Sequence, residues 1–150
     1  MKNIALILIL SAVLFTLSSC YLERVNPDAL MQDLIHELSY TGTVYSTKYK
    51  EGEVGCITDT LRKQLFTNLD IVPEEYAVYL YSGLDFVCEV GMLSSLGKPD
   101  KADILNLCRE RIAFLSSLTS GTGDVMLYRG IVIYYFSTDG KIKDAIEKIT

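Results

Sequence analysis

The chain has 150 residues, a formal net charge of −5 and 49% hydrophobic residues. An acidic balance argues against nucleic-acid binding, which needs a basic stripe. The many aliphatic residues and only three prolines argue against disorder, and the length suits one domain.

The N-terminal segment, MKNIALILILSAVLFTLSSC, has the organisation of a secretory signal. One lysine precedes 14 residues, Ile4 to Leu17, that are apolar apart from a serine and a threonine. As a helix this run is roughly 21 Å long, against roughly 30 Å for the hydrocarbon core of a bilayer. The length therefore fits a cleaved signal better than a membrane span.

The stretch LSSC, ending at Cys20, resembles the lipobox of bacterial lipoprotein signal peptides. The resemblance implies that the Cys20 thiol receives a diacylglyceryl group and that cleavage makes Cys20 the first residue of the mature protein. The alternatives are an ordinary signal peptide cut nearby and an uncleaved membrane anchor. We expect a signal peptide over residues 1–19, a short lipid-anchored tether over 20–26 and a single domain over 27–150.

Such an anchor would place the chain on the extracytoplasmic side of the cell membrane. All 19 acidic residues and 13 of the 14 basic residues lie after Ser19, which gives the mature chain a net charge of −6. Repulsion from an anionic surface, about 1 kcal/mol per nearby charge, is outweighed by two buried acyl chains, on the order of 20 kcal/mol. The tether between Cys20 and Pro27 reaches at most about 20 Å, so we expect the domain to lie close to the membrane.

The folded part is predicted to begin with a helix at Asn26-Pro27, with asparagine as the cap and proline in the first helical position. Apolar residues then recur at helical spacing from Leu30 to Leu38. His36 lies off this stripe, and we interpret it as a surface residue.

The next segments carry weaker signals. Residues 40–55 are rich in Thr, Tyr and Gly and are predicted to be mostly loop, with a short strand near Val44 as the alternative. The stretch CITDTLRKQLF predicts a short helix and NLDIVPEEY a bend.

Alternation of period two then predicts a β-hairpin. One run extends from Tyr76 to Tyr81 and the other from Leu84 to Met92, and they are joined by a turn at Ser82-Gly83.

A long helix is predicted over GKPDKADILNLCRERIAFLSSLTSG, with Pro99 and Asp100 in its first turn and Gly121 after its end. The stretch GDVMLYRGIVIYYFS predicts a second hairpin around Arg129-Gly130.

The stretch TDGKIKDAIEKI predicts a final helix, on which Lys148 is spaced to pair with Asp144. The sequence as a whole predicts an α+β domain. Its sheet is about four-stranded and largely antiparallel, with two β-hairpins separated by a long helix and helices packed on one face.

Three cysteines remain after Cys20: Cys56, Cys88 and Cys108. Their spacing lacks a metal-binding signature. We interpret Cys88 and Cys108 as small core residues, with a disulfide between two of the three as the alternative.

No catalytic, cofactor-binding or metal-ligating pattern is found. Asp85 and Glu89, on one strand, would be about 13 Å apart, too far for paired carboxylates. The unusual feature is ten tyrosines without tryptophan. Tyr79, Tyr81, Asp85 and Glu89 are predicted to share one side of the first hairpin and to form an open sheet face for protein or glycan contact. The alternative is that these rings lie in the core or under a helix.

From about Leu65 onward the chain resembles a family of small, uncharacterised lipoproteins of Gram-positive bacteria, a domain of unknown function. Three stretches carry the resemblance: LDIVPEEYAVYLY, GMLSSL before DILNLCRERIAFL, and LYRGIVIYYFSTDGKIKDAIEKI. The resemblance implies the envelope location and the fold, and it implies no catalytic residue.

Together these observations predict a lipid-anchored, non-enzymatic envelope protein without a cofactor. It would bind membrane lipid through its anchor, and an envelope protein or glycan through the sheet face or the 40–55 loop. One alternative is a small-ligand carrier or enzyme whose site is assembled from distant residues. Another is an assembly subunit joined through an exposed edge strand.

Overall fold

The computed structural model describes residues 25–39, 41–83 and 86–150. Cys20, the predicted lipid attachment point, lies outside them. The elements are α2 (Pro27–Glu37), β1 (Thr43–Ser46), α3 (Asp59–Leu65), the 3-10 helix η1 (Leu69–Ile71), β2 (Tyr76–Ser82), β3 (Val87–Ser94), α4 (Lys101–Leu118), β4 (Thr122–Tyr128), β5 (Ile131–Ser137) and α5 (Lys141–Ile149).

The strands form one antiparallel sheet in the order β1-β2-β3-β5-β4. The predicted α+β class is confirmed, as are two hairpins separated by the long helix α4. The described sheet has five strands where about four were predicted. Residues 43–46 carry little local signal and become a strand by pairing with Ala77 to Leu80 of β2.

Local chemistry sets several boundaries. The Asn26 side chain accepts a hydrogen bond from the Asp28 N–H at 2.8 Å, and Pro27 opens α2 as predicted. Arg129 (φ 43°) and Gly130 (φ 82°) join β4 to β5, because a two-residue hairpin turn with positive φ at both positions matches the twist of the strands. The long helix α4 is shorter than predicted, with Asp100 as its N-cap and Thr119 as its C-cap.

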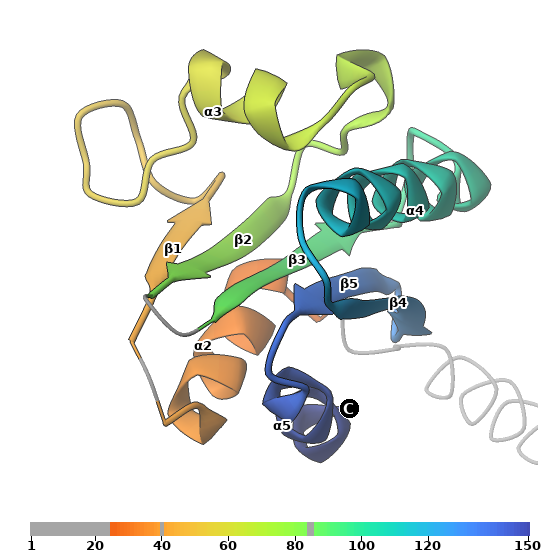
Figure 1. Ribbon diagram of the computed structural model, residues 1–150. Coiled ribbons are helices and arrows are strands. Elements are labelled where there is room, and N and C mark those ends of the chain that lie inside the picture. Colours follow the sequence, from red (N-terminus) through yellow and green to blue (C-terminus); the bar gives the residue numbers. More distant parts are fainter. Residues whose placement is uncertain (1–24, 40, 84–85) are drawn as a thin grey trace, which may run out of the picture.

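Helices cover both faces of the sheet, so the prediction that they pack on one face is wrong. In Figure 1, α3 and α4 lie on one side of the strands, and α2 and α5 lie on the other. All seven residues of β5 are buried, which is the pattern of a strand packed on both sides.

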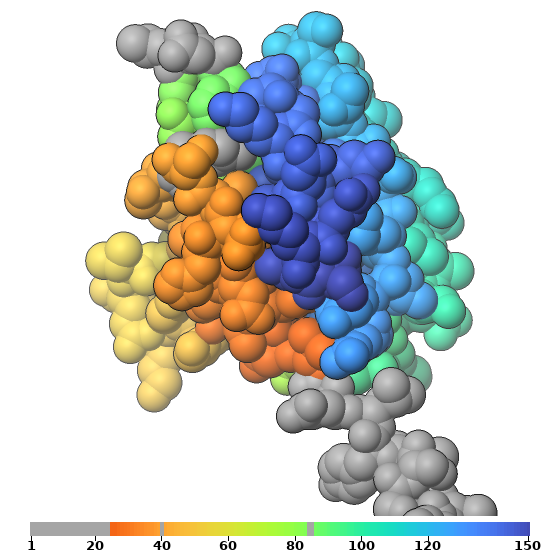
Figure 2. All heavy atoms as spheres, turned by 90° about the horizontal axis from the view of Figure 1, so that it is seen from below, coloured from red at the N-terminus to blue at the C-terminus, as the bar shows by residue number. Residues whose placement is uncertain are grey.

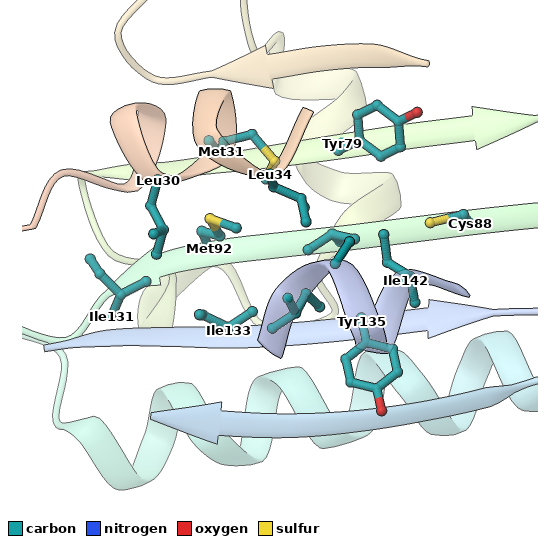
Figure 3. Close-up of a cluster of buried hydrophobic side chains, with 14 residues drawn as sticks. Leu30, Met31, Leu34, Tyr79, Cys88, Met92, Ile131, Ile133, Tyr135 and Ile142 are labelled. Atoms are coloured by element: carbon teal, nitrogen blue, oxygen red, sulfur yellow. The ribbon is translucent and has the colours of Figure 1, made fainter. Parts of the chain in front are cut away.

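The core between the sheet and helices α2 and α5, here the α2/α5 core, is drawn in Figure 3. Figure 2 shows the two helices side by side over this face. The buried members of the core are Leu30, Met31, Leu34, Ala77, Tyr79, Cys88, Val90, Met92, Ile131, Ile133, Tyr135, Ile142, Ala145 and Ile146.

The opposite face packs against α3, η1 and α4 and forms the α3/α4 core. Its buried members are Leu65, Phe66, Val72, Tyr76, Val78, Leu93, Ile104, Leu107, Cys108, Val132 and Tyr134.

The start of α2 identifies one end of the sheet. Leu30 lies beside Ile131 and Met92 in Figure 3, and the Lys48 ammonium binds the Asp28 carboxylate at 2.9 Å. We call this end, where Ser94 pairs with Ile131, the proximal end. The helix α4 starts near it and runs to the distal end, where β4 begins.

Candidate functional site

The residues of the predicted tyrosine surface do not share an open face. Tyr79 is 0% exposed and lies in the α2/α5 core. Tyr81 is partly buried and stacks on Phe86, with ring centroids 4.5 Å apart. Glu89 is 4% exposed, and Asp85 lies outside the described residues. The prediction of an exposed Tyr79–Glu89 face is wrong, because helices cover both sides of the sheet.

The register of the first hairpin separates Tyr79 from Glu89. Tyr79 pairs with Val90 and Leu80 pairs with Glu89, so Glu89 points to the face opposite Tyr79. The alternation of faces within each of these two strands was predicted correctly. Which residues of one strand share a face with which residues of the other depends on the turn that joins them.

Glu89 forms a buried ion pair with Arg111 of α4. The Arg111 Nε–H donates to Glu89 Oε1 and the Nη2–H to Oε2, both at 2.7 Å. The Tyr134 hydroxyl also donates to Oε1 at 2.7 Å, and Arg111 Nη1 donates to the Gln64 carbonyl at 2.9 Å. These bonds hold α4 and the end of α3 against the middle of the sheet.

This cluster is not arranged for proton transfer near pH 7. Burial alone would lower the pKa of Arg111, but its hydrogen bond to Glu89 and the charge of Glu89 raise it above the usual value. Burial, followed by the charge of Glu89, raises the pKa of Tyr134 well above its usual value. A general acid or base works best with a pKa near the working pH, so the cluster is a structural element.

Gly91 makes room for the Tyr134 ring. A Cβ atom at position 91 would overlap that ring. The glycine is therefore required by the close approach of β3 and β5 on the α3/α4 face.

Beside Arg111 lies a small depression, which we call the α3/α4 hollow, with a volume of about 180 Å³. Leu65, Phe66, Leu107 and Phe114 give it apolar walls, and Arg111 contributes its guanidinium, 5.4 Å from the centre of the Phe114 ring. The remaining lining residues are polar: Lys63, Gln64 and Thr67.

Two apolar side chains on α4 are exposed near the hollow. Phe114, in its wall, is 48% exposed, and Leu118, one helical turn further, is 66% exposed. Residues four apart lie on the same side of a helix, so the two form one apolar ridge on the distal half of α4.

An open acidic groove of about 530 Å³ lies at the proximal end. It is lined by Asp70, Glu74, Asp100 and Asp103, with Lys98, Val72 and Pro99. Among the described residues, no three His, Cys, Asp or Glu side chains are placed to hold a metal ion.

A neighbouring cavity of about 330 Å³ contains Arg62 and Tyr76. The Arg62 Nη2–H donates to the Leu69 carbonyl at 3.2 Å, and its buried Nε has no hydrogen-bond partner. Burial raises the pKa of Tyr76 to about 12. The lining carboxylates of Asp59 and Glu74 outnumber the single guanidinium, so the arrangement does not make an anion site.

Cys88 and Cys108 are buried, as predicted for core residues. They lie in different cores on opposite faces of the sheet, so a disulfide between them would have to pass through it. Burial raises the pKa of the Cys108 thiol to about 12, which makes it unreactive. Cys56 is partly exposed in the loop between β1 and α3.

The two edges of the sheet differ. The strand β1 has four residues, and the chain folds back over it so that the Ser46 N–H donates to the Gly55 carbonyl at 2.9 Å. At the other edge β4 has seven residues, and no strand pairs with its outer side within the described chain.

Arg111 was not among the predicted site residues, although the sequence carries a signal for it. Ile104, Cys108 and Leu115 recur at helical spacing and form a buried stripe on α4, and Arg111 lies on the same stripe, three residues beyond Cys108. Glu89 likewise interrupts an apolar strand. An arginine on the buried face of a helix and a glutamate in a buried strand indicate an ion pair between them, since a lone buried charge is rarely tolerated.

No family model, curated protein or solved structure matches the chain. Among the described helices, none combines the length and the apolar character needed to cross a bilayer.

Proposed function

We propose that this chain is a lipid-anchored, extracytoplasmic interaction protein that binds an envelope protein partner through the α3/α4 hollow. The observation that carries the proposal is the apolar hollow, which is bordered by the exposed ridge of Phe114 and Leu118. The buried ion pair between Arg111 and Glu89 fixes α4, which forms one wall of the hollow, against the sheet.

The anchor rests on the lipobox-like segment ending at Cys20. The fold is compatible with a short tether, since α2 begins at Pro27 and Val25 already packs against the α2/α5 core. The relationship to the small lipoproteins of Gram-positive bacteria is likewise a proposal that rests on the sequence.

A tether of about 20 Å keeps the proximal end near the bilayer. The hollow and its ridge lie between Leu107 and Leu118, toward the distal end of α4. The proposed docking surface is therefore accessible to a protein beside or above the anchored domain.

The size of the hollow favours a protein partner over a small ligand. Ligand pockets are typically about 300–1,000 Å³, whereas about 180 Å³ accommodates one apolar side chain. Partners commonly anchor such a side chain in a well-packed pocket near the centre of the interface. Three of the five Arg111 N–H groups bind Glu89 and Gln64, which leaves two donors for a partner carbonyl.

An enzyme is less well supported. In the buried cluster the pKa values of Arg111 and Tyr134 are raised further above neutral pH. The acidic groove is open to solvent, so it does not exclude water from a reacting group.

Labelling with a tagged fatty acid tests the anchor. The wild-type chain is expected to take up label and the Cys20→Ala variant to take up none. Equal labelling of both, or no labelling of the wild type, contradicts the anchor.

Photo-crosslinking in intact cells tests the surface. A crosslinkable residue at position 118, on the ridge, is expected to capture a defined protein, whereas one at Gln32, exposed on the opposite face, is not. Adding Phe114→Ser should abolish the capture, while a cooperative urea transition shows that the variant still folds. Capture that survives this substitution, or that is equal from position 32, contradicts the proposed surface.

A further inference from the structure

The outer edge of β4 has few of the features that usually protect an edge strand. It is seven residues long and its pairing with β5 is continuous, without a bulge. Its sequence, TGDVMLY, contains neither proline nor lysine. Long regular edges of this kind are templates for the addition of another strand.

The outward-facing amides of β4 can be identified from the hairpin. In a two-residue hairpin the closing pair, here Tyr128 and Ile131, exchanges hydrogen bonds, and bonded positions then alternate along the strand. The N–H groups of Leu127, Val125 and Gly123 therefore point away from β5.

The central one of these three donors, the Val125 N–H, is already hydrogen-bonded to the side chain of Asp124. Its carboxylate Oδ1 accepts a hydrogen bond from the Val125 N–H at 2.7 Å. Asp124 is exposed and is the single charged residue of the strand. A strand that adds to this edge must take the Val125 N–H with its own carbonyl and thereby displace the carboxylate.

The displaced carboxylate needs a new partner. It would lie beside the backbone carbonyls of the incoming strand unless a basic side chain stands opposite or diagonally across on the same face. Opposite charges at such cross-strand positions stabilise the pair, and like charges destabilise it.

The described charged groups around Tyr135, the cross-strand partner of Asp124, sum to a negative charge. Asp124 pairs with Tyr135, whose pKa is raised by burial and then by the charges of Asp124 and Glu147. Glu147 lies 3.8 Å from Lys143, so these three charged groups leave a net charge of −1.

A second copy of the chain fits this edge poorly. In a two-fold antiparallel pair centred on Val125, each Asp124 faces the Met126 position of the other copy, and the two Asp124 residues occupy diagonal positions on one face, with Cα atoms about 7–8 Å apart. The net charge of the chain, −5, adds to the repulsion.

We propose that β4 is a strand-addition edge, separate from the α3/α4 hollow, that takes an extended partner segment carrying a lysine or arginine opposite Asp124. The carboxylate of Asp124 moves from the Val125 N–H to the basic side chain as the partner carbonyl takes its place. Backbone bonds supply the affinity of such strand addition, and side chains supply the choice of partner.

Fluorescence anisotropy of labelled peptides on the full chain tests this proposal. The probes are two seven-residue peptides of alternating valine and threonine, one with a central lysine and the other with a central glutamate. The wild type should bind the lysine peptide about fivefold more tightly, because attraction in one complex is replaced by repulsion in the other. Asp124→Lys should reverse the preference, and Asp124→Asn should remove it.

Val125→Pro is the matched backbone control. It removes an outward N–H and no bond to β5, so the fold should persist while both peptides lose binding. Hydrogen exchange should show protection over residues 122–128 and not over 43–46 when the lysine peptide binds.

Three outcomes overturn the proposal. They are equal or undetectable binding of both peptides to the wild type, protection at β1, and a concentration-dependent wild-type dimer that itself protects residues 122–128. The last outcome would identify a second copy as the occupant.

Discussion

The two faces of the sheet are held by different interactions. The α2/α5 core consists of aliphatic, sulfur-containing and tyrosine side chains, and its two helices lie against each other. On the other face a bidentate ion pair between α4 and β3 lies among the apolar residues. Apolar packing is non-directional, whereas the ion pair fixes the position of α4.

This difference indicates why the candidate docking surface lies on the α3/α4 face. Arg111 binds Glu89 on the side of α4 that faces the sheet, and the Tyr134 hydroxyl also donates to Glu89. Because these contacts attach α4 to the sheet, Phe114 and Leu118 can remain exposed on the helix. The opposite face buries its apolar residues between the sheet and the two helices α2 and α5. The following predictions test the contrast, from the largest expected effect to the smallest.

Arg111→Met should have the largest effect, lowering the free energy of unfolding by about 3–5 kcal/mol, because Glu89 is left buried and unpaired. Urea denaturation measures the change. The double variant Arg111→Met, Glu89→Leu should recover part of the loss, because both charges are removed while the buried Tyr134 hydroxyl loses its acceptor. A loss below about 1 kcal/mol for the single variant contradicts the buried pair.

Leu34→Ala should lower the free energy of unfolding by about 2–5 kcal/mol, because it leaves a cavity in the α2/α5 core. Here the loss comes from packing alone. The matched control is Gln32→Ala on the exposed side of the same helix, which should stay within about 0.5 kcal/mol of the wild type. Equal effects of the two substitutions would contradict the packing of α2 on the sheet.

Alkaline pH should destabilise the fold through both faces of the sheet, because burial also raises the pKa of Tyr79, in the α2/α5 core, to about 12. Burial raises the pKa of Tyr76 and of the Cys108 thiol to about 12, and the pKa of Tyr134 is also well above its usual value. These groups ionise at lower pH in the unfolded chain, so their contribution to stability is present below about pH 9 and is lost as pH rises toward 12.

The urea midpoint should therefore be flat from pH 7 to about 9 and fall above it. Tyr134→Phe should make the fall shallower, because phenylalanine does not ionise. Stability that rises above pH 10 would contradict the sign of these shifts.

Lys148→Ala should have the smallest effect, less than about 1 kcal/mol. The Lys148 ammonium lies 2.9 Å from the Glu37 carboxylate and joins α5 to α2, but the side chains are 64% and 39% exposed. The midpoint of thermal unfolding at low and high salt measures the contribution. A larger loss, or one that does not shrink in high salt, contradicts a screened surface pair.

The sequence by itself determined the features that depend on neighbouring residues. The cap at Asn26, the proline that opens α2, the turn at Arg129-Gly130 and the alternation in the two strands of the first hairpin were all predicted, because each rests on preferences within a few positions. The core positions of Cys88 and Cys108 followed from the same periods.

Only the tertiary structure decided how these elements meet. The register that separates Tyr79 from Glu89, the pairing of Glu89 with Arg111 and the pairing of Lys148 with Glu37 instead of Asp144 join residues far apart in the chain. Helices on both faces and the open edge at β4 likewise depend on long-range packing. Local spacing specifies which face a side chain takes within its own element, but it carries no information about which distant element covers that face.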